Sequence, residues 1–219
     1  MSAQSEFFKK EYFEVYDSID LYQNNNVFNG LEYIDNYISL SVENHKFYGS
    51  SDFLKGYIIY NDLPHFNVKM KYDLLNDLVI LEFVNIKVTN LSLNSSLVSQ
   101  FVLNNAQFVR LPQIEILRPF YVNGFFQVAY NGPNYTLYVK YKKSKIEKLR
   151  NKKVYYTFKS NEVYVLFYKN KYLKINSKKN IIEAIPERET EISNYYKFNK
   201  RLYKKSKHQF FVKLFTSLK

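Results

Sequence analysis

The sequence predicts an α+β protein built mainly on an antiparallel sheet, strongly twisted or barrel-like, with an N-terminal helix and C-terminal helices. Runs rich in Tyr, Phe and β-branched residues recur through the middle of the chain, and turn residues separate them. Apolar residues repeat at helical spacing near both ends. With 46% hydrophobic and 19% aromatic residues among 219, the chain has enough apolar side chains to bury a sizeable core.

The first segment has the pattern of an amphipathic helix. Its apolar residues Phe8, Tyr12, Val15 and Ile19 lie three or four positions apart, and the pattern ends by Asn24. We expect residues 1–26 to be a helical extension of a single domain that spans 1–219.

An antiparallel β core is expected over residues 56–175. Period-two alternation starts at Gly56 and predicts a three-stranded meander over 57–60, 66–72 and 78–83. Two or three short strands are expected between residues 86 and 118.

The second part of the β core contains a hairpin and another meander. Gly132 and its Asn neighbours suit a hairpin turn between strands 125–130 and 136–142. The meander that follows is expected over 154–159, 163–168 and 172–175, with turns at Ser160-Asn161 and Lys169-Asn170.

Helices are expected over residues 177–218. Pro186 suits a helix start, and Ser206 with Gln209 forms a capping box. The final helix should bury an apolar stripe against the sheet, made of Phe210, Phe211, Leu214, Phe215 and Leu218.

Composition excludes several chemistries. The chain has no Cys, which removes thiol nucleophiles, disulfides and cysteine-ligated metals. Its five Gly are never clustered as a P-loop or dinucleotide fingerprint requires. No Gly-x-Ser-x-Gly or His-x-x-x-His spacing occurs. We therefore expect no catalytic residues, no metal site and no cofactor.

Two polar features invite a functional interpretation, and each has a structural alternative. Asp73, Asn76 and Asp77 could converge on a cation such as calcium, but turns favour the same residues because their side chains bond nearby amides. The structural interpretation is preferred. His65 and His208 are expected to be surface residues.

Positive charge is concentrated in the second half of the chain. Residues 1–120 hold 9 Lys/Arg and 14 Asp/Glu, whereas residues 121–219 hold 23 and 6. A basic face attracts phosphate- or carboxylate-bearing partners, although lysines also serve as solvated surface residues. The candidate binding residues are Lys140, Lys142, Lys143, Lys145, Lys197, Lys200, Arg201 and Lys204.

Several segments carry a family resemblance. Gly56 to Asn61 is followed by Lys71-Tyr72-Asp73 with Asp77, then by Phe108 to Leu111 and by Gly124 to Gly132. Over roughly residues 30–218 the chain resembles uncharacterised exported β-rich cell-envelope proteins of Bacteroidota, although Asn61-Asp62 departs from the expected Asp-Gly turn. The resemblance implies an extracytoplasmic location and brings no catalytic residues.

The N-terminus leaves the compartment open. Met1-Ser2-Ala3-Gln4 precedes charged sequence and not the apolar segment of a signal peptide. The protein is extracytoplasmic, in the periplasm or at the surface, if Met1 replaces a removed signal peptide, and cytoplasmic otherwise.

These observations predict a non-catalytic envelope component that binds or scaffolds other macromolecules. An envelope protein is the expected partner, and anionic lipid or lipopolysaccharide headgroups are another possible one. The alternative is a basic nucleic-acid-binding module that uses the Lys/Tyr-rich strands and the C-terminal helix. No run of residues is long and apolar enough to predict a transmembrane segment.

Overall fold

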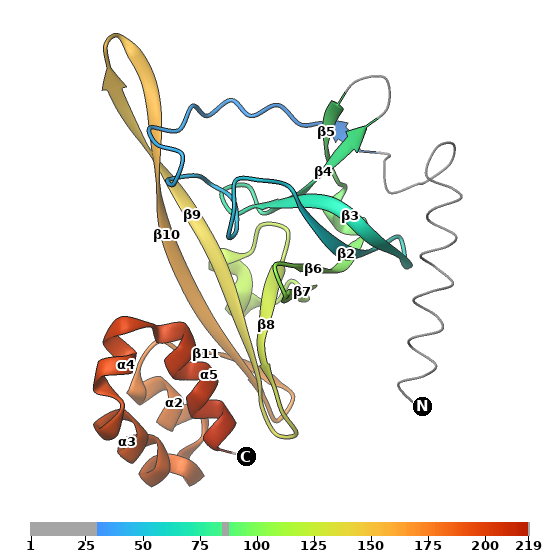
Figure 1. The fold of residues 1–219 in the computed structure, drawn as a ribbon. Coiled ribbons are helices and arrows are strands. Elements are labelled where there is room, and N and C mark those ends of the chain that lie inside the picture. The colour runs from blue at the N-terminus through green and yellow to red at the C-terminus, as the bar shows by residue number, and fades with distance from the viewer. Residues whose placement is uncertain (1–29, 85–87, 219) are drawn as a thin grey trace. The chain divides into compact units, whose positions relative to one another are not determined.

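The computed structural model describes residues 30–84 and 88–218 (Figure 1). The helix predicted over residues 1–26 lies outside the described residues. Eleven strands form an antiparallel sheet in the order β1-β5-β4-β3-β2-β6-β7-β8-β9-β10-β11. Its two end strands, β1 and β11, are different edges, so the sheet is open. The α+β class is confirmed, because helices follow the last strand at the C-terminus.

β9 and β10, with 15 and 16 residues, are longer than the other described strands. Their bounds are β1 Leu31–Glu32, β2 Leu54–Tyr60, β3 Leu63–Asp73, β4 Leu78–Val84, β5 Val88–Ser92, β6 Val98–Leu103, β7 Ala106–Arg110, β8 Phe125–Asn131, β9 Thr136–Arg150, β10 Lys153–Tyr168 and β11 Lys171–Lys174. The helices are η2 Ser95–Leu97, η3 Glu115–Phe120, α2 Lys178–Ala184, η4 Pro186–Arg188, α3 Glu189–Phe198, α4 Lys200–Lys205 and α5 Lys207–Ser217.

Most predicted strands are confirmed. β2, β3 and β4 form the first meander, and β5, β6 and β7 are the short strands expected between residues 86 and 118. β8 pairs with β9 as the expected hairpin. The turn predicted at Ser160-Asn161 is wrong, because β10 runs through both residues without interruption. β9 likewise continues to Arg150, well past the predicted end at residue 142.

The chain forms two compact units. Of the described residues, unit 1 contains 30–84, 88–111, 122–125 and 142–160, and unit 2 contains 112–121, 126–141 and 161–218. β9 and β10 each contribute residues to both units. The single domain expected over 1–219 therefore stays a prediction.

Unit 1 is centred on a cluster of buried aromatic rings. Tyr72, Phe101, Phe108 and Phe125 are fully buried. The rings of Phe101 and Phe108 stack with centroids 4.8 Å apart, and Tyr72 meets both edge-on. Offset and edge-to-face contacts of this kind stabilise a core beyond the apolar area that they bury. The aromatic content of the sequence is thus used to hold β3, β6 and β7 together.

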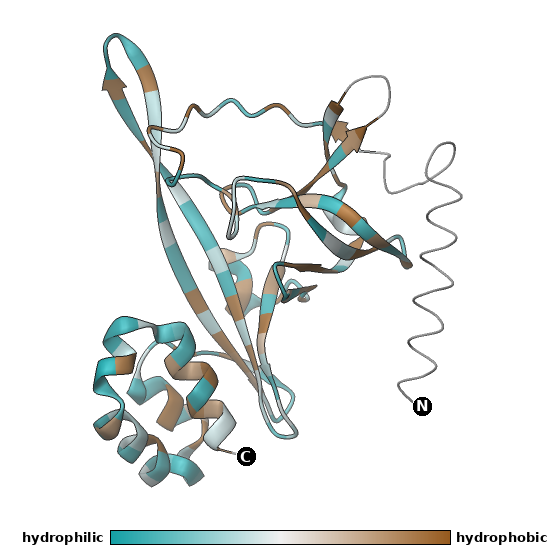
Figure 2. Cartoon of the chain, viewed as in Figure 1, coloured by the Kyte–Doolittle hydropathy of each residue, from teal (hydrophilic) through white to brown (hydrophobic). Residues whose placement is uncertain are grey.

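Unit 2 packs four helices around strand residues of β9 and β10. Figure 2 shows apolar and polar residues alternating along strands and around helices, which gives each element a buried side. Ser206 caps α5 by accepting a hydrogen bond from the Gln209 amide at 3.2 Å, as predicted. The apolar stripe of α5 is also confirmed, since all five predicted residues are buried with Leu137, Val139, Tyr164 and Leu166.

Candidate functional site

β9 and β10 extend as a two-stranded ribbon that ends in an exposed tip. We call residues 144–154 the hairpin end. Every residue from Ser144 to Val154 is exposed, and Asn151 and Lys152 form the turn with φ of 51° and 60°. In Figure 1 this end of the ribbon continues past the point where the segment before β2 meets β10. The hairpin end is thus a projection from unit 1.

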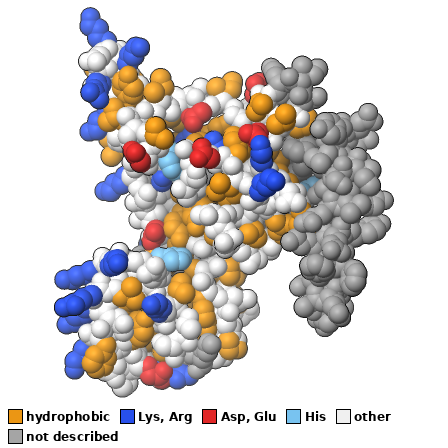
Figure 3. Space-filling model, in the orientation of Figure 1, with side chains coloured by type: hydrophobic (Ala, Val, Ile, Leu, Met, Phe, Trp, Pro, Cys, Tyr) orange, Lys and Arg blue, Asp and Glu red, His pale blue; other side chains and the backbone are white. Residues whose placement is uncertain are grey.

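The hairpin end combines cations with aliphatic side chains. Glu147 is its single acidic residue. Leu149 is 76% exposed, Ile146 44% and Val154 39%. Figure 3 shows basic and hydrophobic side chains together over this element. Its basic residues are Lys145, Lys148, Arg150, Lys152 and Lys153.

Strand geometry sorts these side chains onto two faces. A two-residue turn makes Arg150 and Lys153 partners across the ribbon and makes Leu149 and Val154 the next pair. Because successive side chains point to opposite faces, Leu149 and Val154 share one face and Arg150 and Lys153 share the other. The tip therefore presents a basic pair next to the turn on one face and an aliphatic pair one position further from the turn on the other face.

A strap, residues 33–48, holds the base of the ribbon. The Leu40 amide donates to the Tyr156 carbonyl at 3.0 Å, and the Tyr156 amide donates to the Ile38 carbonyl at 2.9 Å. The Asn44 side chain completes the pairing, since it accepts from the Phe158 amide at 2.6 Å and donates to the Phe158 carbonyl at 3.1 Å. The strap thus fixes the direction in which the hairpin end leaves unit 1.

Two lysines at the base make further contacts with the strap. The Lys143 ammonium donates to the carbonyl oxygens of His45 and Phe47, and burial lowers the pKa of Lys143. Lys145 donates to the Tyr37 hydroxyl at 3.2 Å and lies 4.5 Å from the centroid of the Tyr37 ring. These two lysines therefore hold the ribbon against the strap and also add positive charge to it.

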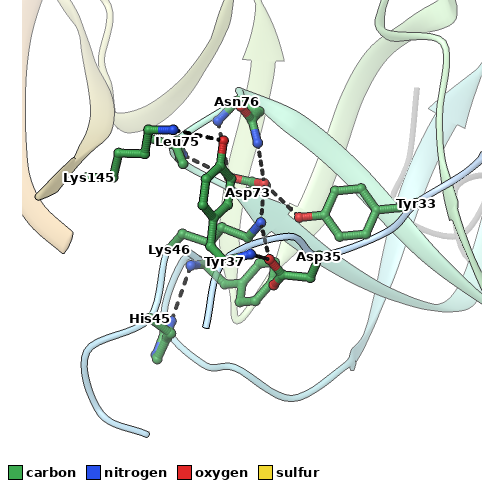
Figure 4. A network of polar contacts seen from close by, with 10 residues as sticks. Tyr33, Asp35, Tyr37, His45, Lys46, Asp73, Leu75, Asn76 and Lys145 are labelled. Atoms are coloured by element: carbon green, nitrogen blue, oxygen red, sulfur yellow. Dashed lines mark hydrogen bonds and ion pairs between the residues drawn. The ribbon is translucent and has the colours of Figure 1, made fainter. Parts of the chain in front are cut away.

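The strap is anchored in turn by a buried ion network (Figure 4). Lys46 is 2% exposed and lies 2.8 Å from an Asp35 oxygen and 3.4 Å from an Asp73 oxygen. The rings of Tyr33 and Tyr37 surround its ammonium at 5.0 and 4.8 Å. Two carboxylates and two ring faces compensate the cost of taking this charge out of water.

The turn residues singled out in the sequence have structural partners. Asp73 accepts hydrogen bonds from the Leu75 and Asn76 amides, from the Asn76 side chain at 2.9 Å and from the Tyr33 hydroxyl at 2.9 Å. Burial and the Asp73 carboxylate raise the pKa of Tyr33.

Asp77 has a similar role at the other end of the same turn, between β3 and β4. It accepts from the Tyr72 hydroxyl and from the amides of Asn123 and Gly124 at 2.7 and 3.0 Å. The preferred structural interpretation of the Asp73, Asn76 and Asp77 cluster agrees with this geometry.

The predicted basic residues are divided between the two units. Lys140 is fully buried in unit 2, with its ammonium 5.4 Å from the Phe126 ring. Lys142 and Lys143 are half-buried, and only Lys145 lies in the hairpin end. The other four predicted residues are exposed in unit 2. There α3, α4 and the start of α5 carry a helical basic surface made of Lys197, Lys200, Arg201, Lys204, Lys205 and Lys207.

His65 and His208 are both less exposed than the surface residues that the sequence predicts. His65 is 5% exposed, because β3 places it on the inner face of the sheet. His208 is half-buried, and its Nδ1 lies 3.1 Å from the Tyr141 hydroxyl, which donates to Gln127 at 2.7 Å. Desolvation lowers the pKa of His208.

Unit 2 also has an open hollow of about 630 Å³ beside β11, α2 and η4. Its charged groups are partly paired, since Lys169 lies 3.1 Å from Glu187. The pKa of Glu187 is lowered to about 2, chiefly by a hydrogen bond from Tyr168. Part of the charge that lines the hollow is therefore already paired within unit 2.

Sequence reasoning missed most of the hairpin end. Lys148, Arg150, Lys152 and Lys153 are not among the candidate binding residues predicted from the sequence. The signal that could have found it is Asn151 between two β-compatible stretches, because Asn tolerates the left-handed conformation of a two-residue turn.

Comparisons with family models, curated proteins and solved structures found no match for this chain. Within residues 30–84 and 88–218, no helix is long and apolar enough to cross a bilayer. Across the same residues, no group of three or more His, Asp and Glu side chains is placed to hold a metal ion.

Proposed function

We propose that the protein is a non-catalytic component of the cell envelope, in the periplasm or at the cell surface, that binds or scaffolds other macromolecules. The observation that carries the proposal is the hairpin end, an exposed basic projection on a ribbon that the strap fixes at its base. Binding elements are commonly loops or hairpins mounted on a rigid scaffold. The family resemblance supports the envelope location.

The environment of the most buried charges supports a non-catalytic role. Lys46, Asp73 and Asp77 are three of the buried ionisable residues of unit 1. Each of them is held by partners from within the chain, at a turn or at the strap. Groups in such positions stabilise local structure and are not aimed at a substrate.

The charge of the projection supports an anionic partner. An envelope protein with an acidic surface fits this charge, and so do the headgroups of anionic lipid or lipopolysaccharide. The chain as a whole has a formal net charge of +12, which favours encounter with such partners over long distances at low salt.

A nucleic-acid-binding module is the second candidate function. A basic two-stranded ribbon is narrow enough to enter a DNA major groove. Two tyrosines of the Lys/Tyr-rich strands are however engaged within unit 2. Tyr141 donates to Gln127, and the ring of Tyr138 lies 6.2 Å from that of Tyr172.

Fractionation and site-specific cross-linking in the source cells test the proposal. We expect the chain, expressed from its native locus, to be recovered with the envelope. A photo-cross-linking residue at Leu149 should capture a partner, whereas one at Val42, which is 80% exposed on the strap, should not. Recovery in the cytosol, or equal capture from both positions, would contradict the proposal. Capture of DNA or RNA from Leu149 would favour the second candidate.

A further inference from the structure

We propose that the hairpin end docks on the surface of an anionic lipid bilayer, with Leu149 and Val154 in the headgroup layer. This inference rests on the proposed envelope function and names the partner of the same surface. It is argued from the exposed aliphatic pair, the surrounding charge and the way the ribbon is mounted.

Both side chains of the aliphatic pair are exposed. Leu149 is 76% exposed and Val154 39%, and both lie next to the turn on one face of the ribbon. Exposed aliphatic side chains at a projecting tip gain from transfer into an apolar phase. A convex tip reaches the acyl boundary of a bilayer without requiring a preformed pocket in a partner.

The cations match the other half of the bilayer surface. Arg150 and Lys153 lie on the face of the ribbon opposite to Leu149 and Val154. Lys152 is in the turn, and Lys148 is two positions before Arg150. Each basic side chain near an anionic leaflet adds to binding, and long basic side chains place their charge at the phosphates while their stems lie along apolar groups. Glu147 is the single opposing charge.

The geometry of the ribbon limits how deep it can go. A two-stranded ribbon leaves backbone N–H and C=O groups unpaired along both outer edges, and these groups cannot be left unsatisfied in hydrocarbon. The headgroup layer still supplies water and phosphate oxygens. We therefore expect shallow docking by the tip and no insertion of the ribbon across the bilayer.

The strap makes this docking a rigid-body event. Hydrogen bonds from residues 38–44 to Tyr156 and Phe158 hold the ribbon before any partner is bound. Little conformational entropy is then lost on binding, because the side chains are presented by a preformed element.

Co-sedimentation of the full chain with vesicles tests the proposal. We expect binding to phosphatidylcholine vesicles that contain phosphatidylglycerol, weak binding to phosphatidylcholine alone, and release at high salt. The triple variant Lys148→Gln, Arg150→Gln, Lys153→Gln should bind roughly a hundredfold more weakly. Its matched control removes the same charge from the helical basic surface, as Lys200→Gln, Arg201→Gln, Lys204→Gln, and should lose much less.

The aliphatic pair is tested separately. Leu149→Ser with Val154→Ser should weaken vesicle binding roughly tenfold, whereas Val42→Ser on the strap should leave it unchanged. The absence of Cys permits a single environment-sensitive dye at Leu149→Cys or Val42→Cys. The dye should report an apolar shift on anionic vesicles only at position 149. Circular dichroism verifies that each variant is folded.

The outcomes separate this inference from the proposed function. No binding of the full chain to anionic vesicles, an equal loss in the helical control, or no dye shift at position 149 would overturn lipid docking. Cross-linking of Leu149 to an envelope protein would then keep the proposed function with a different partner. Salt-dependent retention on single-stranded DNA or RNA, lost in the hairpin variants but with no vesicle binding, would also overturn it.

Discussion

Lys46 joins the strap to the end of β3, which is distant from it in sequence. Its ammonium meets Asp35 on the strap and Asp73 at the end of β3, and it lies among the rings of Tyr33 and Tyr37. Removing one partner of a buried ion pair leaves the other charge uncompensated. The position of the strap therefore depends on this one side chain more than on any exposed charge nearby.

Lys46→Met should lower the free energy of unfolding by about 3 kcal/mol, because Asp73 would stay buried without its counter-ion. The matched control is Lys69→Met, which breaks a surface pair with Glu82 in which the lysine is 52% exposed, and about 0–1 kcal/mol is expected there. Urea denaturation measures both values. Equal losses in the two variants would show that the buried network contributes no more than a surface pair.

His208 should make the stability of the protein depend on pH. Burial lowers its pKa below the ordinary 6.5, so the unfolded chain binds more protons than the folded chain as the pH falls through that value. The free energy of unfolding should therefore decrease on acidification. His45, whose pKa is also lowered, contributes in the same direction, while the Glu162 carboxylate opposes the shift at His208.

His208→Asn should flatten this dependence between pH 7 and about pH 5, because asparagine can still bond the Tyr141 hydroxyl but does not titrate. Denaturant titrations at several pH values measure the slope. A slope identical to that of the native chain would mean that His208 takes no part in it.

Burial of single polar residues is where sequence reasoning has least to work with. Lys140 follows Val139 in β9, and both are buried, so the alternation that marks one inner and one outer face fails there. A lysine in a Lys/Tyr run looks solvated until the elements on both sides of its strand are known. His65 shows the same difficulty in β3.

Two-residue turns shape most hairpins of the sheet without glycine. Four pairs adopt positive φ at both positions, namely Asn61-Asp62, Asn104-Asn105, Asn151-Lys152 and Lys169-Asn170. Asn and Asp tolerate the left-handed region because their short side chains bond locally, whereas Lys has no such compensation. The two turns that contain Lys therefore hold residues with a less favourable backbone conformation.

Lys152→Gly should slow amide hydrogen exchange beside the tip of the ribbon, by stabilising the closed turn by about 0.5–1 kcal/mol. Lys152→Val should speed it, because a β-branched residue is strained at a φ of 60°. Amides of β2 and β3 are internal references that should not change. Faster exchange in the glycine variant would contradict the expectation.

The elements were largely predictable where local signals agreed with the final packing. The first meander, the hairpin of β8 and β9 and the capped α5 were all expected, because turn chemistry and apolar period coincide there. Ser160-Asn161 has turn composition but lies in the middle of β10, where both residues are exposed. A polar pair on an exposed stretch of strand has the same local pattern as a turn.

At the scale of the molecule, the two units do not divide the charge in the way that the two halves of the sequence do. The first half of the chain is acidic and the second half basic, but the hairpin end belongs to the unit built mostly from the first half. Residues 142–160 thus bring a basic element into an acidic neighbourhood, where Asp35 and Asp73 neutralise Lys46. Local pattern cannot reveal which unit a long strand joins, so the site could not be assembled from the sequence.

Each unit has its own core, which permits them to open separately. Leu214→Ala should destabilise unit 2 by about 2–5 kcal/mol, because Leu214 is fully buried among the rings of α5 and β10. Hydrogen exchange should quicken in α5 and in β9 near residue 139. The amides of Tyr48, Leu74, Lys143 and Tyr156 in unit 1 should stay protected, since their acceptors are in the same unit. A uniform increase in both units would show that they unfold as one.

The side chain of Asn44 has a consequence for self-association. It occupies both the amide and the carbonyl of Phe158, and the strap takes those of Tyr156, so this stretch of β10 has no backbone group to offer to an incoming strand. Edges that cannot template a neighbour do not grow sideways into fibres. A protein rich in tyrosine and phenylalanine strands thus gains protection from stacking with its own copies at this place.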